Sequence, residues 1–170
     1  TLTDSHSLAQ LKTINNATSG TITLNSYAVA LSGSTADVKA SLAGTFADTY
    51  TGNVTIGDAN AADIQATDIT TINGDTTGTI TVTNTIDVNG TAAQVKAAFD
   101  AIDTNTGGAT ATLSDAHTLA ELKSINNATG GSITLHDATV ALSGSSADVK
   151  AALFAITGYT GAVTLTDSHS

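Results

Sequence analysis

The sequence predicts an α/β solenoid of short strand–helix repeats, with a parallel β-sheet on one side and short helices on the other. Three observations predict this fold class: a repeat of about 55 residues, apolar residues at helical spacing behind a capping motif, and Thr-Ile-Thr alternation that follows glycine. One short helix and one strand cannot bury their apolar faces alone, but stacked copies can.

The repeat is clearest between residues 2–24 and 113–135, which begin Leu-Thr-Asp-Ser-His and Leu-Ser-Asp-Ala-His. A more diverged copy lies between them. Equivalent aspartates follow one another at steps of 54, 57 and 52 residues, at Asp4, Asp58, Asp115 and Asp167. We therefore expect a single repeat array over residues 1–170, with units at approximately 4–57, 58–114 and 115–166.

One heptapeptide occurs twice. Thr-Leu-Thr-Asp-Ser-His-Ser stands at residues 1–7 and again at residues 164–170. The second occurrence predicts the start of a further copy at 164–170. It also favours an open-ended array of stacked units over a closed globular domain.

Each unit divides into two halves of about 27 residues. In the first unit, the pattern predicts helices at 8–14 and about 35–42, and strands at 21–24, 28–31 and 54–56. The helices are supported elsewhere by apolar residues at i, i+4 and i+7, which form one stripe along a helix: Val95, Phe99 and Ile102, and Val149, Leu153 and Ile156. The strands are supported by alternation that turns Ile and Leu inward and Thr outward.

Five helix starts carry the pattern of a capping box, in which a Ser or Thr hydroxyl accepts from the amide three residues later. The side chain of that later residue is expected to reach back to the cap amide. The five pairs are Ser7/Gln10, Ser34/Asp37, Thr91/Gln94, Thr118/Glu121 and Ser145/Asp148.

The composition excludes several classes of function. The chain has no Cys and no Arg, which leaves no thiolate chemistry and no bidentate clamp for phosphate. A net charge of −10 disfavours nucleic acid and anionic membranes as partners. No run of about 20 apolar residues is present, so we expect no membrane insertion. We find no nucleophile with a base and an orienting group, and predict that the chain is not an enzyme.

The repeated aspartates are the main candidate site. Asp4, Asp58, Asp115 and Asp167 fall between a strand and a helix, and Asp63 follows Asp58 closely. One interpretation is purely structural, since Asp suits turns. The other is a calcium site, because Ca²⁺ takes six to eight oxygen ligands from carboxylates, hydroxyls and carbonyls. No other cofactor is expected.

Two further features each allow a structural and a functional interpretation. His6, His117 and His169 occupy equivalent positions, each two residues after an Asp, and are expected to be solvated loop residues rather than a periodic metal or acid–base site. His136 has no counterpart in another copy. The Thr-x-Thr stretches fit exposed strand positions, and an ice-binding ladder of Thr side chains is the alternative.

The run Asp68-Ile-Thr-Thr-Ile-Asn-Gly-Asp-Thr-Thr-Gly-Thr-Ile, followed by Val88-Asn-Gly-Thr-Ala-Ala-Gln-Val-Lys, resembles repeats in very large secreted proteins of cyanobacteria and other marine bacteria. Those proteins include surface-layer, giant adhesin and haemolysin-like calcium-binding proteins. The resemblance implies an extracellular or cell-surface location. We expect a structural repeat protein that forms or extends a surface layer, sheath or fibre by stacking with copies of itself. The alternative is the stalk or binding module of a calcium-dependent adhesin, with cell-surface glycans as partners.

Overall fold

The computed structural model describes residues 1–168, and these form an α/β structure of short helices and parallel strands. The helices are α1 (Leu8–Ala17), α2 (Thr35–Leu42), α3 (Ala66–Asp75), α4 (Ala92–Ala101), α5 (Leu119–Ala128) and α6 (Ser146–Leu153). The strands are β1 (Leu31–Gly33), β2 (Val54–Ile56), β3 (Asp63–Gln65), β4 (Ile80–Val82), β5 (Asp87–Gly90), β6 (Thr104–Asn105), β7 (Thr110–Leu113), β8 (Ile133–Thr134), β9 (Leu142–Gly144) and β10 (Val163–Leu165).

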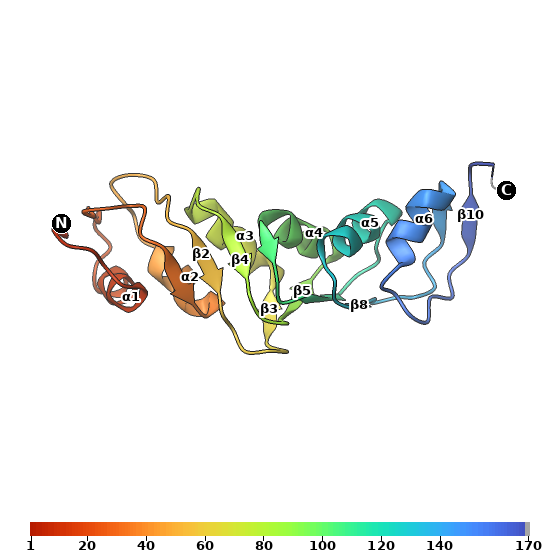
Figure 1. Cartoon of the computed structure of the whole chain (residues 1–170), viewed down its shortest axis with the longest axis horizontal. Helices are drawn as coiled ribbons and strands as arrows, with labels where there is room; N and C mark the ends of the chain where they lie inside the picture. Colours follow the sequence, from red (N-terminus) through yellow and green to blue (C-terminus); the bar gives the residue numbers. More distant parts are fainter. Residues whose placement is uncertain (169–170) are drawn as a thin grey trace.

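The helices follow one another in a row along the long axis of the molecule, and the two chain ends lie at opposite ends of it (Figure 1). Each helix packs against the next along the chain. Successive helices begin 27, 31, 26, 27 and 27 residues apart, at residues 8, 35, 66, 92, 119 and 146. This spacing agrees with the half-unit expected from the sequence.

The strands form more than the one sheet expected. Two four-stranded parallel sheets have the orders β1-β2-β4-β6 and β3-β5-β7-β8, and β9 pairs with β10 in a separate parallel pair. The reason lies in the connections between helices. The segment between α3 and α4 holds two strands, β4 and β5, and each joins a different sheet. In Figure 1, β4 accordingly lies above β3 and β5 in the view.

The core is continuous along the row of helices because each half-unit contributes one apolar stripe. In α3, Ile69 and Ile72 are fully buried, and in β4 Ile80 and Val82 are buried while Thr81 between them is partly exposed. Neighbouring segments also approach closely. A Cβ at Gly78 would lie 2.3 Å from the Gly52 carbonyl oxygen, so only glycine fits there.

Most of the predicted elements are present, with shifts at the ends. The helix at 35–42 and the strand at 54–56 are confirmed, and the first helix extends beyond 14 to Ala17. The strand expected at 28–31 begins only at Leu31. The strand expected at 21–24 is present only as a single parallel bridge, between Ile22 and Phe46.

Three of the five expected capping boxes are complete, at the starts of α1, α4 and α5. In α2 and α6, the Ser hydroxyl caps the helix as expected, but the Asp does not complete a box. Aspartate is one methylene shorter than Gln or Glu. Its carboxylate instead accepts from a lysine of the preceding helix, in the pairs Lys12–Asp37 and Lys123–Asp148.

Candidate functional site: the joints between successive half-units

Three of the repeated aspartates bind the N-termini of helices that precede them in the chain. One Asp58 carboxylate oxygen accepts from both the backbone amide and the hydroxyl of Thr35, at 2.7 and 2.6 Å. Asp115 accepts from the amide of Ala92 at 2.7 Å. Thr35 and Ala92 are the first residues of α2 and α4. Helix N-termini carry unpaired amides and a partial positive charge. A carboxylate accepts a hydrogen bond from such an amide and its negative charge interacts favourably with the helix terminus.

The third aspartate repeats this geometry at α6. Asp167 accepts from the backbone amide and the hydroxyl of Ser146, each at 2.8 Å. These two hydrogen bonds lower the pKa of the Asp167 carboxyl, the one from the backbone amide most. The ionised form is therefore the one that the helix terminus favours.

Strand register explains why the three aspartates reach equivalent places. In the parallel ladders, Ile56 pairs with Gly33, Leu113 with Gly90, and Leu165 with Gly144. Each glycine stands just before an even-numbered helix, and each aspartate stands two residues after the paired apolar residue. We call this unit a joint: a glycine, the helix start after it, the apolar residue opposite the glycine, and the capping aspartate.

The remaining two candidate aspartates are placed differently. The side chain of Asp4 is exposed and makes no hydrogen bond within residues 1–168. Asp63 is also exposed and pairs in register with Asp87, whose carboxylate accepts from the hydroxyls of Thr110 and Thr112 at 2.7 Å. In the described part of the chain, no three His, Cys, Asp or Glu residues gather in a way that could hold a metal ion. Calcium binding therefore stays a prediction.

His6 and His117 are buried, so the expectation that they are solvated loop residues was wrong. His6 and His117 are each only 4% exposed. His6 Nε2 lies 3.1 Å from the hydroxyl oxygen of Tyr50, and His117 lies against Tyr159 with ring centroids 6.3 Å apart. Burial lowers the pKa of both histidines. Each tyrosine hydroxyl donates to a backbone carbonyl, of Val29 and Val140 respectively.

These two His–Tyr pairs link a loop before an odd-numbered helix to the segment after the next helix. Sequence reasoning missed the tyrosines, although the repeated tripeptide Tyr-Thr-Gly at 50–52 and 159–161 could have indicated them. His136 is exposed and follows β8. His169 lies outside the described residues.

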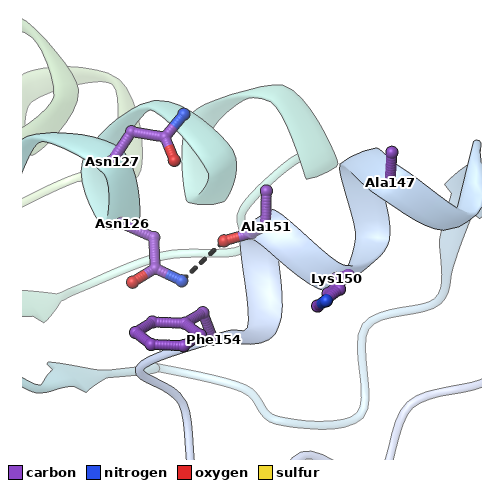
Figure 2. A pocket seen from close by; sticks show the side chains of 6 residues that line it. All are labelled: Asn126, Asn127, Ala147, Lys150, Ala151 and Phe154. Carbon is purple, nitrogen blue, oxygen red and sulfur yellow. Dashed lines mark hydrogen bonds between the residues drawn. The ribbon is translucent and has the colours of Figure 1, made fainter.

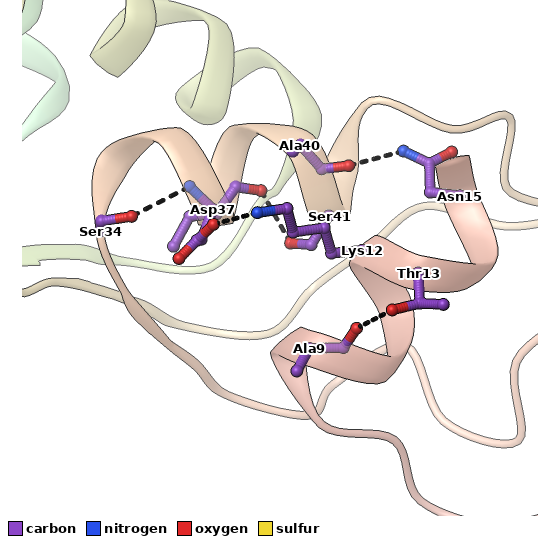
Figure 3. A network of polar contacts seen from close by, with 9 residues as sticks. Ala9, Lys12, Thr13, Asn15, Ser34, Asp37, Ala40 and Ser41 are labelled. Carbon is purple, nitrogen blue, oxygen red and sulfur yellow. Dashed lines mark hydrogen bonds and ion pairs between the residues drawn. The ribbon is translucent and has the colours of Figure 1, made fainter. Parts of the chain in front are cut away.

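A second set of contacts joins the helices on their outer side. Every lysine occupies the fifth position of a helix: Lys12, Lys39, Lys96, Lys123 and Lys150. Three of them reach the aspartate at the third position of the next helix, in the pairs Lys12–Asp37, Lys39–Asp68 and Lys123–Asp148. Figure 3 shows the first of these beside the amide of Asn15, which donates to the Ala40 carbonyl at 2.7 Å. Lysine lowers the pKa of Asp37 and of Asp148.

A pocket of about 280 Å³ lies between α5 and α6, with Phe154 at its rim. Figure 2 shows the lining side chains, which are Asn126, Asn127, Ala147, Lys150, Ala151 and Phe154. Lys150 is the one titratable group among them. Nothing in this lining supplies a nucleophile next to a base.

The first sheet also aligns hydroxyl side chains. Ser32, Thr55 and Thr81 pair in register across β1, β2 and β4, and Thr104 of β6 continues the column. All four are at least partly exposed, which places a ladder of hydroxyls on the outer face of this sheet.

No protein-family model, curated protein or solved structure matches this chain. No helix within residues 1–168 is long and apolar enough to cross a membrane.

Proposed function

We propose that the chain is a solenoid segment whose function is structural: an extended, non-enzymatic unit of an extracellular surface layer, sheath or fibre. The observation that carries this proposal is the repetition of one joint. The same glycine, helix start, apolar residue and capping aspartate recur at α2, α4 and α6. Polar residues that another protein would use in a binding site are here used to hold one half-unit to the next.

The nature of these contacts supports a load-bearing or spacing role over catalysis. A helix N-terminus is bound by a carboxylate from the following half-unit, and a lysine reaches forward to the next helix. Such contacts link each half-unit only to its neighbours, and arrays built in this way extend without a size limit set by a closed core. The acidic surface keeps the array soluble.

The test of this function is where the protein is found and what it forms there. Antibodies against the chain should label a layer, sheath or fibre outside the cell in electron micrographs of the native material. Label confined to the cell interior, or label on dispersed particles outside it, would contradict the proposal.

The calcium-dependent adhesin remains the alternative. After treatment with a chelator, calorimetric titration with Ca²⁺ should give no heat and no change in Tm if the aspartates act only as caps. Heat together with a rise in Tm would favour the adhesin, because a ligand that binds only the folded state stabilises it.

The hydroxyl ladder of the first sheet favours one further function, the binding of ice through aligned Thr side chains. Thermal hysteresis of a solution of the protein tests it directly. A freezing point equal to the melting point would remove this candidate.

A further inference from the structure

The first and third units of the repeat differ in side chains at places where their backbones make the same contacts. Over residues 2–42 the two align without a gap, and each residue has its counterpart 111 positions further on. The carbonyl of Tyr27 accepts from the amides of residues 51–52, and the carbonyl of its counterpart Ala138 accepts from those of residues 160–161. The first unit therefore shows what can occupy the space around the same backbone in the third.

In the first unit, two aromatic side chains pack against the core beside Ile22. The ring of Tyr27 is turned back along the chain, and its hydroxyl oxygen accepts from the Leu24 amide at 3.1 Å. Phe46 follows α2 and forms the single bridge with Ile22. Both rings pack against the core. The phenol of Tyr27 thus covers apolar surface and also satisfies a backbone donor.

The third unit has neither ring. Ala138 stands in the place of Tyr27, and Thr157 in the place of Phe46 when residues are counted from the preceding helix. Between β8 and the segment after α6 (Figure 1) lies a cavity of about 240 Å³. Its lining consists of both of these small residues and three residues of and after β8: Ile133, Thr134, Leu135, Ala138 and Thr157.

The same replacement leaves a backbone donor without its acceptor. The Leu135 amide is the counterpart of the Leu24 amide, and it donates to no acceptor within residues 1–168. Leu135 is half-buried and lines the cavity. A donor held in a partly enclosed space without a partner is unfavourable, so this amide favours an occupant that carries an acceptor.

The cavity has the size for one ring. A cavity of about 150 Å³ binds benzene, and pockets for drug-sized ligands begin at about 300 Å³. The cavity of the third unit lies between these sizes, which suits a six-membered ring with one or two small substituents. None of the five lining residues is charged, and burial of an unpaired charge is costly, so the lining favours a neutral ligand.

We propose that the cavity beside β8 binds a small neutral phenol, whose ring takes the place that Tyr27 has in the first unit and whose hydroxyl oxygen accepts from the Leu135 amide. The first unit carries this phenol as a side chain, and the third unit takes it from solution. The ring packs between two successive half-units. This site goes beyond the proposed structural function and does not depend on it.

Titration with para-cresol, the tyrosine side chain as a free molecule, tests the site by NMR of the isotope-labelled chain. The Leu135 amide resonance should shift and saturate with a Kd of about 1 mM, as expected for a ligand with a single ring. Toluene has the same ring and methyl group without the hydroxyl, and should bind about fivefold more weakly because one hydrogen bond is lost. The absence of a saturable shift at Leu135, or equal affinities for the two compounds, would overturn the proposal.

Filling the cavity gives the matched pair of variants. Ala138→Tyr restores the side chain of the first unit and should abolish the binding of para-cresol. Ala141→Tyr makes the same change at an exposed position and should bind para-cresol like the parent. If circular dichroism shows that Ala138→Tyr does not fold, Thr157→Phe restores the other ring and should abolish binding instead. A folded variant with a filled cavity and the affinity of the parent would contradict the site.

The reciprocal variant is Tyr27→Ala, which removes the phenol from the first unit. It should open a counterpart site, so that para-cresol shifts the Leu24 amide as well as the Leu135 amide. A folded Tyr27→Ala variant without a response at Leu24 would count against the first unit as the template. Shifts confined to the side-chain amide of Asn126, which lines the pocket between α5 and α6, would place the ring there and refute the assignment.

Discussion

The most informative single change is Asp58→Ala, because Asp58 makes the first joint alone. Its carboxylate accepts from the amide and the hydroxyl of Thr35, a residue only 2% exposed. Loss of a helix cap costs about 1 kcal/mol, and a buried donor left without a partner costs about 1–3 kcal/mol. We expect Asp58→Ala to lower the free energy of unfolding by about 2 kcal/mol. For a chain of this size, that corresponds to a fall in Tm of about 4–8 °C.

The assay is urea unfolding followed by circular dichroism, supported by thermal melts. Asp115→Ala removes one hydrogen bond instead of two, so it should cost about 1 kcal/mol. Asp63→Ala is the control, and as an exposed change it should stay within about 0.5 kcal/mol of the parent. The reasoning is refuted if Asp58→Ala and Asp63→Ala have the same midpoint and the same dependence on urea.

Two further predictions follow from packing and from burial. Gly78→Ala should destabilise the protein by about 1–3 kcal/mol, because its Cβ would meet the Gly52 carbonyl. Gly74→Ala should stabilise it by about 0.5–1 kcal/mol, because Gly74 lies in α3 with open space around it. In urea unfolding the two changes in the free energy of unfolding should have opposite signs, and changes of the same sign would refute the close approach at Gly78. His6 and His117 have lowered pKa values, so below the ordinary histidine pKa the unfolded chain binds protons that the folded chain does not, and stability should fall as the pH drops from about 7 toward 5. Replacing both histidines by Asn should flatten the dependence of Tm on pH over that range, and an unchanged slope would count against the burial of the rings.

The sequence was sufficient for features that are encoded within one or two turns of the chain. Helix α2 and strand β2 have the predicted bounds, and three capping boxes formed as expected. These signals are local: an apolar stripe, a hydroxyl three residues before an amide, and an alternation after glycine. The repeat length also predicted the spacing of the helices.

Contacts between half-units could not be predicted in this way. The expected single sheet is divided because each connection between helices can hold two strands, and pairing across the array decides which sheet each joins. The hydrogen bond from Thr35 to Asp58 joins residues 23 positions apart and depends on strand register, which cannot be read from the sequence alone. His6 is buried because Tyr50, 44 residues away, packs against it.

The same limit explains the incomplete capping boxes of α2 and α6. The hydroxyl and the N3 residue could be read from the sequence, but the lysine of the preceding helix could not be placed. Asp37 accepts from Lys12 because the fifth position of one helix faces the third position of the next. A local motif was therefore changed by a contact that exists only once the helices are side by side.

The central claim is that the half-units stack in an extended row. Small-angle X-ray scattering of the dilute chain tests it most directly. A compact domain of this length would have a radius of gyration of about 15 Å. We predict a clearly larger radius and a distance distribution with a single early maximum and a long tail. A symmetric, bell-shaped distribution with a radius of gyration near 15 Å would contradict the extended row.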